Sequence, residues 1–282
     1  MRALTFLASR FVAGDNAEDA VDAVCELNRL GIKATLDFLG EDCESEAQAE
    51  AATLEYESLL DSIHKARLDC NVSLKLTQFG MNLDTGLAES NLIRVVTKAE
   101  SLGNFVRVDM ESSAYTQGTL DLFKRVFLEH KNCGVVVQSS LRRTAADVAE
   151  LNALGARVRL CKGAYKEPAS AAFQEKALVN KSYDESAAAL LKDGTYPGLA
   201  THDEARIAEA IRFARENGVA ADRFEFQMLY GLRPKRWREL VADGWNMRVY
   251  VPYGTHWLPY FTRRIRERKE NWMFVLKNLA GG

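Results

Sequence analysis

Short apolar runs alternate along the chain with longer stretches in which apolar residues recur every three or four positions. The runs are rich in β-branched and aromatic residues, which is typical of buried strands. They predict eight strands, at residues 33–39, 71–77, 104–110, 134–139, 157–162, 198–201, 223–228 and 246–251. The longer stretches predict helices at 46–68, 87–101, 120–130, 145–154, 169–192, 203–216 and 234–242. Two further helices are predicted, at 16–30 and 257–279.

Boundary residues support several of these helices. Gly103, Gly155 and Gly218 stand just past the ends of three helices, where a left-handed glycine commonly terminates the helix. Thr144, with an acidic residue three positions later, resembles a capping sequence. Asp203 forms with the preceding histidine a pair that resembles a ligand or a base, but its place before a helix favours an N-cap.

Eight strands that alternate with helices predict an α/β protein with a single (β/α)8 barrel domain over residues 1–282. Residues 1–31 would be a helical lead-in, and 257–279 would be the last helix. The alternative is a doubly wound open sheet. The chain has neither a G-x-G-x-x-G nor a P-loop motif, so the barrel is favoured, and a nucleotide cofactor would not bind in the Rossmann manner.

Composition narrows the classes of function. The chain carries 37 basic and 39 acidic side chains, a balance that gives no electrostatic case for nucleic-acid binding. Its apolar runs fall short of the ~20 residues that span a bilayer, and its N-terminus lacks a convincing signal peptide. The 5 cysteines are scattered without a C-x-x-C pair, and the 4 histidines lack metal-ligand spacing. We therefore expect a cytoplasmic protein without a metal site.

In such barrels the active site lies at the C-terminal ends of the strands. Polar residues expected there are Asp37, Glu41, Lys75, Asp109, Glu111, Gln138, Arg159, Lys162, Tyr165, Thr201, His202, Asp203, Glu225, Gln227, Tyr230, Tyr250 and Tyr253. Cationic, amide and phenolic groups around one rim suit an anionic substrate together with a large polar cofactor. Individually, the charged members could instead form buried structural ion pairs.

Arg263 and Arg264 stand out because they follow the last strand and open the last predicted helix. Each guanidinium keeps its charge and can bind a carboxylate or a phosphate in bidentate fashion. A helix start adds unpaired backbone N–H groups that favour anions. The alternative is a solvated helix face.

Segments of the chain, taken in order, resemble the proline dehydrogenase (proline oxidase) family, in its monofunctional bacterial type. They are VSLKL at 72–76, VRVDME at 106–111, VQSSLRRT at 137–144, VRLCKGAYKE at 158–167, ATHD at 200–203, FQMLYG at 226–231 and Y-x-x-R-R-x-x-E at 260–267. The similarity runs from RFVAG at 10–14 to the final helix. It implies FAD-dependent oxidation of L-proline to 1-pyrroline-5-carboxylate by hydride transfer to flavin N5. Electrons would pass to a quinone, in the first step of proline catabolism to glutamate.

The resemblance also implies site residues. Arg263 and Arg264 would bind the proline carboxylate, Lys75 would lie near the ring nitrogen, and Asp109 would orient the site. The proline ring would be enclosed by Tyr165, Leu229, Tyr250 and Tyr260. FAD would be bound by Asp109, Gln138, Arg159, Lys162, Ala164, Thr201, His202, Gln227, Tyr230 and Glu267. Arg159 would lie near either flavin N5 or the pyrophosphate. Tyr250 favours proline over hydroxyproline, and Lys166 departs from the tryptophan of some relatives.

The resemblance further implies a separate pyrroline-5-carboxylate dehydrogenase downstream and a peripheral contact with the inner face of the membrane, where a quinone would be reached. The last helix, with Trp272 and Phe274 beside Arg268 and Lys269, is the candidate for lipid contact, although a core-facing helix has the same pattern. Two other functions stay open. One is a Schiff-base aldolase that uses Lys75 or Lys162, and the other is a non-catalytic anion-binding barrel.

Overall fold

The computed structural model describes residues 10–258, 260 and 262. Eight parallel strands close into a barrel in chain order, with β8 paired to β1. They are β1 (Lys33–Phe38), β2 (Cys70–Leu74), β3 (Val106–Val108), β4 (Cys133–Gln138), β5 (Arg157–Cys161), β6 (Gly198–Ala200), β7 (Glu225–Leu229) and β8 (Met247–Tyr253). The predicted (β/α)8 barrel of the TIM type is thus confirmed, and the open sheet was the wrong alternative.

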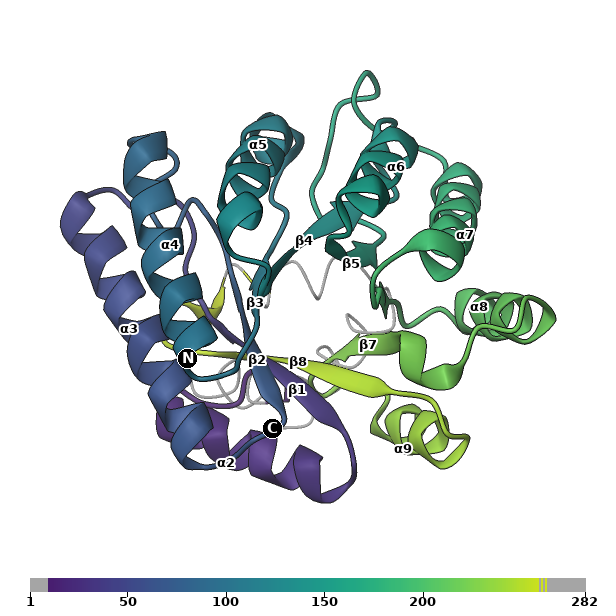
Figure 1. The fold of residues 1–282 in the computed structure, drawn as a ribbon, viewed down its shortest axis with the longest axis horizontal. Helices are drawn as coiled ribbons and strands as arrows, with labels where there is room; N and C mark the ends of the chain where they lie inside the picture. The colour runs from purple at the N-terminus through teal and green to yellow at the C-terminus, as the bar shows by residue number, and fades with distance from the viewer. Residues whose placement is uncertain (1–9, 259, 261, 263–282) are drawn as a thin grey trace, which may run out of the picture.

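Helices form a ring around the strands (Figure 1). After the leading helix α2 (Ala17–Arg29), they are α3 (Glu46–Lys65), α4 (Thr85–Ser101), α5 (Ser113–Glu129), α6 (Thr144–Leu154), α7 (Lys176–Asp193), α8 (Glu204–Glu216) and α9 (Pro234–Ala242). A short 3₁₀ turn, η1 (Ala221–Arg223), precedes β7. None of the helices within the described ranges is long and apolar enough to cross a membrane.

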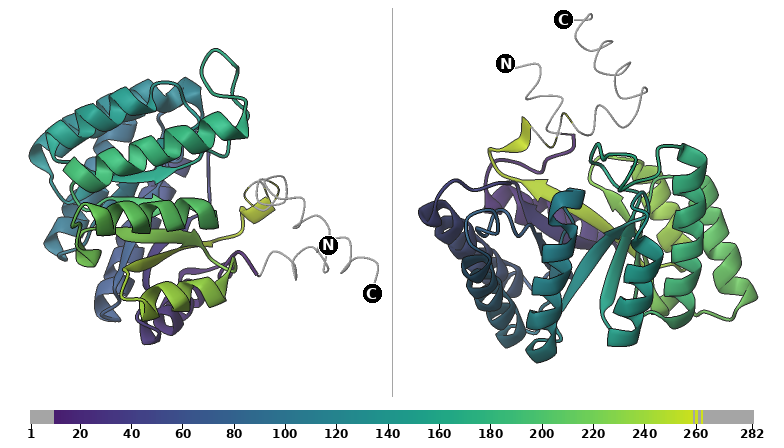
Figure 2. Two further views of the ribbon diagram at one scale, coloured as in Figure 1. Left: turned by 90° about the vertical axis from the view of Figure 1, so that its right-hand side faces the viewer. Right: turned by 90° about the horizontal axis from the view of Figure 1, so that it is seen from above.

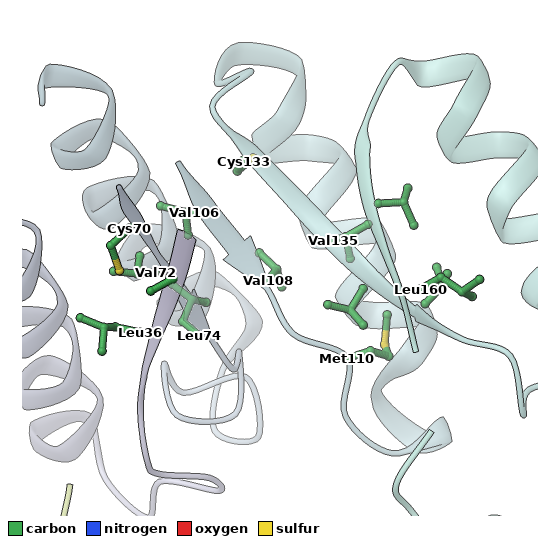
Figure 3. Close-up of a cluster of buried hydrophobic side chains, with 14 of the residues drawn as sticks. Leu36, Cys70, Val72, Leu74, Val106, Val108, Met110, Cys133, Val135 and Leu160 are labelled. Atoms are coloured by element: carbon green, nitrogen blue, oxygen red, sulfur yellow. The ribbon is translucent and has the colours of Figure 1, made fainter. Parts of the chain in front are cut away.

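Strand alternation sorts the side chains into an apolar outer layer and a polar interior. Leu36, Val72, Val106, Val135 and Leu160 are fully buried and belong to the main hydrophobic core, which lies between strands and helices (Figure 3). The intervening residues face the barrel axis. The hydroxyls of Thr35 and Ser73 lie 3.0 Å apart, and Arg159 Nη2 donates to Ser73 Oγ at 3.0 Å. A polar interior of this kind continues upward into the barrel mouth.

One residue expected at the mouth lies at the opposite end of the barrel. Glu225 is the first residue of β7 and is level with Gly198, the first residue of β6. Its Oε1 accepts a 2.7 Å bond from Nε of Arg248, and its Oε2 accepts from the Tyr196 hydroxyl at 3.1 Å. The placement of Glu225 at the strand C-termini was therefore wrong, because successive inward-facing residues of one strand lie in different layers of the barrel.

Helix starts differ from the prediction where local polarity or tertiary contacts override periodicity. Helix α5 begins at Ser113 rather than at 120, because its first turns are polar and contain Gly118. Helix α7 begins at Lys176 rather than at 169, since the preceding segment forms a bridge between Ala172 and Leu141. The predicted capping role of Thr144 was wrong, because its hydroxyl donates to the Gln138 carbonyl at 2.5 Å.

The other predicted cap is confirmed. Asp203 Oδ1 accepts a 3.0 Å bond from the backbone N–H of Ala205 at the start of α8. Trp257 and Leu258 are helical, as the predicted helix at 257–279 requires. Arg263, Arg264, Glu267 and the proposed lipid-contacting residues of that helix lie outside the described residues.

Candidate functional site at the barrel mouth

A cavity of about 830 Å³ opens at the C-terminal ends of the strands. Most of the predicted site residues line it, namely Lys75, Asp109, Arg159, Lys162, Ala164, Tyr165, Thr201, His202, Gln227, Leu229, Tyr250 and Tyr260. Gln138 and Tyr230 are not among the lining residues. The barrel therefore brings together side chains that are spread over more than half of the chain.

The first charged pair at the mouth joins β1 to β2. Lys75 Nζ lies 3.1 Å and 3.2 Å from the two carboxylate oxygens of Asp37, which is fully buried. Burial alone would lower the pKa of Lys75. The charges of Asp37 and Asp109 outweigh that effect and raise the pKa above its ordinary value. Lys75 is therefore a permanent cation in the cavity wall.

Asp109, directly after β3, connects two other strands. Its Oδ1 accepts from Arg159 Nη1 at 2.7 Å, and its Oδ2 accepts from the Tyr250 hydroxyl at 2.8 Å. Burial raises the pKa of Asp109, while Arg159 and Lys75 oppose the rise. The guanidinium of Arg159 lies 5.3 Å from the centre of the Tyr250 ring, which is within cation–π range. Carboxylate, guanidinium and phenol thus fix one another in the cavity wall.

Two lysine side chains, Lys162 and Lys176, line the mouth beyond β5. Lys162 Nζ donates to Asn180 Oδ1 at 2.6 Å and to Asp203 Oδ2 at 2.7 Å, and Lys176 also lines the cavity. Burial would raise the pKa of Asp203, but the hydrogen bond and charge of Lys162, together with the Ala205 N–H and the charge of Arg206, lower the pKa. Asp203 therefore both begins α8 and holds Lys162 at the cavity.

His202 has a defined orientation beside these lysines. Its Nε2 accepts a 3.0 Å bond from the backbone N–H of Leu229, which places the proton of the neutral ring on Nδ1. Its backbone carbonyl accepts from Arg233 Nη1 at 2.6 Å. The imidazole can therefore act as a hydrogen-bond donor through Nδ1.

The connection from β5 to α7 includes Tyr165, which lines the cavity. Part of this connection extends outward beyond the neighbouring helices (Figure 2). The connection starts at Gly163, whose φ of 108° favours glycine and whose added Cβ would overlap Ser140 Oγ. Further along, Glu167 accepts from the backbone N–H of Ser113 at 2.7 Å and from its hydroxyl. These contacts fix the segment of Ala164 and Tyr165 at both ends.

Some lining residues were missed by sequence reasoning. They are Met110, Val136, Cys161, Gly163, Lys176, Ala200 and Met228. The apolar members carry no chemical signal. Lys176 was hidden because the helix it opens was predicted to begin seven residues earlier. Of these residues, Gly163 alone could have been identified from the sequence, because it is a glycine that directly follows the strand-end residue Lys162.

The site is suited to a large polar ligand with negative charge. Its volume lies within the range of ~300–1,000 Å³ that is common for cofactor and ligand pockets. The buried Nε of Arg159 has no hydrogen-bond partner among the residues that the structure describes, so a donor remains for a ligand acceptor. Lys162 and Lys176 supply cations, and Tyr165, Tyr250 and Tyr260 supply ring faces. These groups suit a ligand that combines an anionic group with a planar ring.

The comparisons with known proteins point in one direction. The sequence profile of the family described as "Proline dehydrogenase" matches residues 20–277. "Proline dehydrogenase 1" of Bacillus subtilis (strain 168) is 41% identical over 272 residues, which cover 96% of this chain and 90% of the relative. "Proline dehydrogenase" of Deinococcus radiodurans is 40% identical over 281 residues, covering 98% of this chain and 91% of the relative.

A solved structure has the same barrel. The crystal structure of proline utilization A (PutA) from Bdellovibrio bacteriovorus inactivated by N-propargylglycine superposes with a TM-score of 0.88 at 25% identity. The match covers 95% of this chain and 33% of that chain, so the present chain spans about a third of the PutA length. The cavity described above lies within the matched barrel.

Proposed function

Because the chain belongs to the proline dehydrogenase family, we propose that its barrel mouth oxidises L-proline to 1-pyrroline-5-carboxylate with FAD as cofactor. The observation that carries the proposal is the convergence of Lys75, Asp109, Arg159 and Tyr250 on one cavity. This network offers fixed charges and a ring face at the place where a small cyclic amino acid would bind. Proline oxidation would be the first step of proline catabolism to glutamate.

The residues proposed to bind FAD supply cations and polar groups. Lys162 would face the negative diphosphate, and Arg159 Nε, which has no partner in the described part of the chain, would donate to a ligand acceptor. Gln138, Ala164, Thr201, His202, Gln227 and Tyr230 would complete the site, together with Asp109 and with Glu267, which lies outside the described residues. When bound, the flavin would accept the hydride that leaves the ring carbon next to the proline nitrogen.

Substrate orientation is assigned to cationic and aromatic residues. Arg263 and Arg264, outside the described residues, would bind the carboxylate in bidentate fashion. Tyr165, Leu229, Tyr250 and Tyr260 would enclose the ring and exclude water from the reacting atoms. Lys75, whose pKa is raised by Asp37 and Asp109 against the effect of burial, cannot take up a proton in the neutral range. The amine proton of proline must therefore leave by another route.

The same property of Lys75 argues against a Schiff-base aldolase. A lysine forms an imine only as a neutral amine, and the raised pKa of Lys75 keeps it protonated. The other candidate, Lys162, donates to both Asn180 and Asp203. We expect no covalent adduct when borohydride is added together with carbonyl compounds.

A visible spectrum tests the proposal. After reconstitution with FAD, the protein should show flavin absorbance, and anaerobic L-proline should bleach it while L-alanine should not. Arg264→Ala should remove bleaching at low proline concentration, whereas Arg238→Ala, at an exposed position on α9, should leave it unchanged. A colourless protein, or a flavin that L-proline does not reduce, would contradict the proposed function. Unchanged turnover in Arg264→Ala would remove only the carboxylate assignment.

We further propose that the reduced enzyme passes its electrons to a quinone at the membrane surface and that a separate pyrroline-5-carboxylate dehydrogenase consumes the product. Both follow from the family resemblance. A soluble quinone added anaerobically after bleaching should restore the flavin absorbance. If only dioxygen restored it, the quinone assignment would fail.

A further inference from the structure

Glu111 is a buried carboxylate just behind the cavity wall. It lies three residues past β3, is 3% exposed, and is not among the cavity-lining residues. Both of its oxygens bind Thr77: Oε1 accepts from the backbone N–H at 3.1 Å, and Oε2 accepts from the hydroxyl at 2.6 Å. A bidentate contact of this kind fixes Thr77 relative to β3.

Thr77 passes the constraint on to two other segments. It lies two residues past Lys75, so its position limits where the Lys75 backbone can move. Its Oγ1 accepts from the N–H of Asp42 at 3.0 Å, and its carbonyl accepts from the N–H of Cys43 at 3.1 Å. Asp42 has a φ of 50°, a conformation that a non-glycine residue adopts when surrounding contacts hold it. Glu41 stands directly before it.

The backbone of Glu111 also contacts the end of a fourth strand, β4. Its carbonyl accepts a 2.8 Å bond from Gln138 Nε2, at the end of β4. Asp109, two residues earlier, binds Arg159 and Tyr250. Glu111 therefore joins the connections after β1, β2, β3 and β4 behind the cavity.

We propose that Glu111 is a positioning residue for proline oxidation, which holds Lys75 and the connection with Glu41 and Asp42 in place through its two hydrogen bonds to Thr77. The proposal rests on the proposed function of the cavity. No contact between Glu111 and the substrate is required, because its effect passes through Thr77.

The ionised form of Glu111 satisfies this arrangement better than the protonated form. As a carboxylate it accepts both bonds, while the Thr77 hydroxyl accepts from Asp42 and donates to Glu111. A protonated Glu111 carries an O–H group that donates to the Thr77 hydroxyl oxygen. The Thr77 hydroxyl then accepts from Glu111 instead of donating to it. The Thr77 connection should therefore exist in two hydrogen-bonded forms that differ by one proton.

Burial and the neighbouring charges place the protonation of Glu111 near neutral pH. Burial, helped by the charge of Glu41, raises the pKa of Glu111 to about 7, against the lowering effects of the two Thr77 bonds and of Lys75. Tyr115 also faces it, and the negative charges of Asp42 and Glu111 help burial to raise the pKa of that phenol. Lys75 and Tyr115 keep their protons near pH 7, because both have raised pKa values. We expect KM for proline to rise as the pH falls below about 7.

The test compares Glu111→Gln, Thr77→Val and wild type from pH 6 to 8. The Glu111→Gln variant mimics the protonated form, since a side-chain amide offers one acceptor and one donor to Thr77. We expect KM to rise about three- to tenfold at pH 8, because the Thr77 hydroxyl must then accept from residue 111 and loses its own acceptor there. We expect kcat to change less than twofold and the pH step in KM to be abolished. Thr77→Val should reproduce the rise in KM. Glu129→Gln, at an exposed position on α5, should behave like wild type.

Hydrogen exchange provides a readout without turnover. Residues 40–44 and 76–81 should exchange faster in Glu111→Gln and Thr77→Val than in wild type, with the rest of the barrel unchanged. If Glu111→Gln kept both the wild-type pH step in KM and the wild-type exchange rates, the proposal would be wrong. Should wild type fail to oxidise proline while the variants still exchange faster, the function would be wrong and the positioning contact would stand.

Discussion

The hydroxyl of Tyr250 donates a 2.8 Å hydrogen bond to Oδ2 of Asp109, although 141 residues separate the two in the sequence. Burial raises the pKa of the Tyr250 phenol, and the Asp109 charge adds to the rise. The phenol therefore stays protonated and acts as the hydrogen-bond donor. The other oxygen of Asp109 is held by Arg159. This contact joins β8 to β3 and β5 across the barrel mouth and fixes the ring face that the substrate is proposed to meet.

Tyr250→Phe should remove this bond and retain the ring. Hydrogen bonds to charged groups are worth about 1.5–3 kcal/mol, so we expect kcat/KM for proline to fall by about tenfold or more, mainly through KM. Steady-state kinetics would measure the fall in kcat/KM, and a thermal melt would measure the accompanying change in stability. A kcat/KM equal to that of wild type would show that the bond does not orient the site.

The pair of Glu225 and Arg248 should make the barrel sensitive to acid. Burial would raise the pKa of Glu225, but the charge and hydrogen bond of Arg248, together with the Gln227 amide and the charge of Arg107, lower the pKa to about 2. Because this folded-state pKa lies below the ordinary value of 4.5, the stabilisation is present above about pH 4.5 and is lost as the pH falls toward 2. The contribution is roughly 3 kcal/mol.

Urea unfolding of wild type and Glu225→Gln at pH 7, 5 and 3 would measure this contribution. The variant should be less stable at pH 7, because it leaves the buried Arg248 charge unpaired, and should lose less stability than wild type between pH 5 and 3. Glu57→Gln, at a partly exposed ion pair with Arg94, should change stability by less than about 1 kcal/mol. Parallel pH profiles of wild type and Glu225→Gln would contradict the assignment.

Lys75 and Asp37 should be energetically coupled. Asp37→Asn leaves a buried ammonium with a weaker partner, and Lys75→Met leaves a fully buried carboxylate. Each single change should destabilise the protein by about 3–5 kcal/mol. The double variant should lose less than the sum, which denaturant titration of the full cycle would show. Additive losses would mean that the two groups do not stabilise each other.

Glu167 should control the segment that carries Tyr165. Glu167→Ala removes the acceptor of two bonds from Ser113 at the start of α5. We expect faster hydrogen exchange at residues 163–168 and a severalfold rise in KM for proline, with a thermal midpoint close to wild type because the contact lies in a loop. Ser113→Ala, which keeps the backbone N–H, should show a smaller effect in the same direction. Unaltered exchange in Glu167→Ala would show that other contacts hold this segment.

Lys162 should contribute to FAD affinity. Lys162→Met removes a cation that Asp203 and Asn180 hold at the cavity. Since a charge-assisted contact to a diphosphate would be lost, the dissociation constant for FAD should rise by about tenfold, measured by fluorescence titration of the flavin-free protein. Lys166→Met makes the same change four residues later at an exposed position and should leave affinity unchanged. Equal affinities in the two variants would remove Lys162 from the cofactor site.

Hydrophobic periodicity predicted the fold well, because a parallel barrel repeats one strand–helix unit and each unit has its own hydrophobic pattern in the sequence. The run at 33–39 shows this, since β1 covers Lys33–Phe38. Boundaries were less accurate where the pattern was weak, as in the polar first turns of α5, or where distant contacts decided, as in the bridge of Ala172 to Leu141. The resemblance to a known family, rather than residue chemistry alone, selected most of the site residues.

The sequence by itself determined the eightfold alternation, the apolar layer between strands and helices, and the set of polar residues near the strand ends, because these depend on residue type and local spacing. Only the tertiary structure decided which polar residues share a layer and which charges pair. It places Glu225 at the opposite end of the barrel, where it pairs with Arg248, and it places Tyr250 in contact with Asp109. Pairing depends on strand register and barrel closure, which place residues of different strands at one height and leave no signal within any single strand.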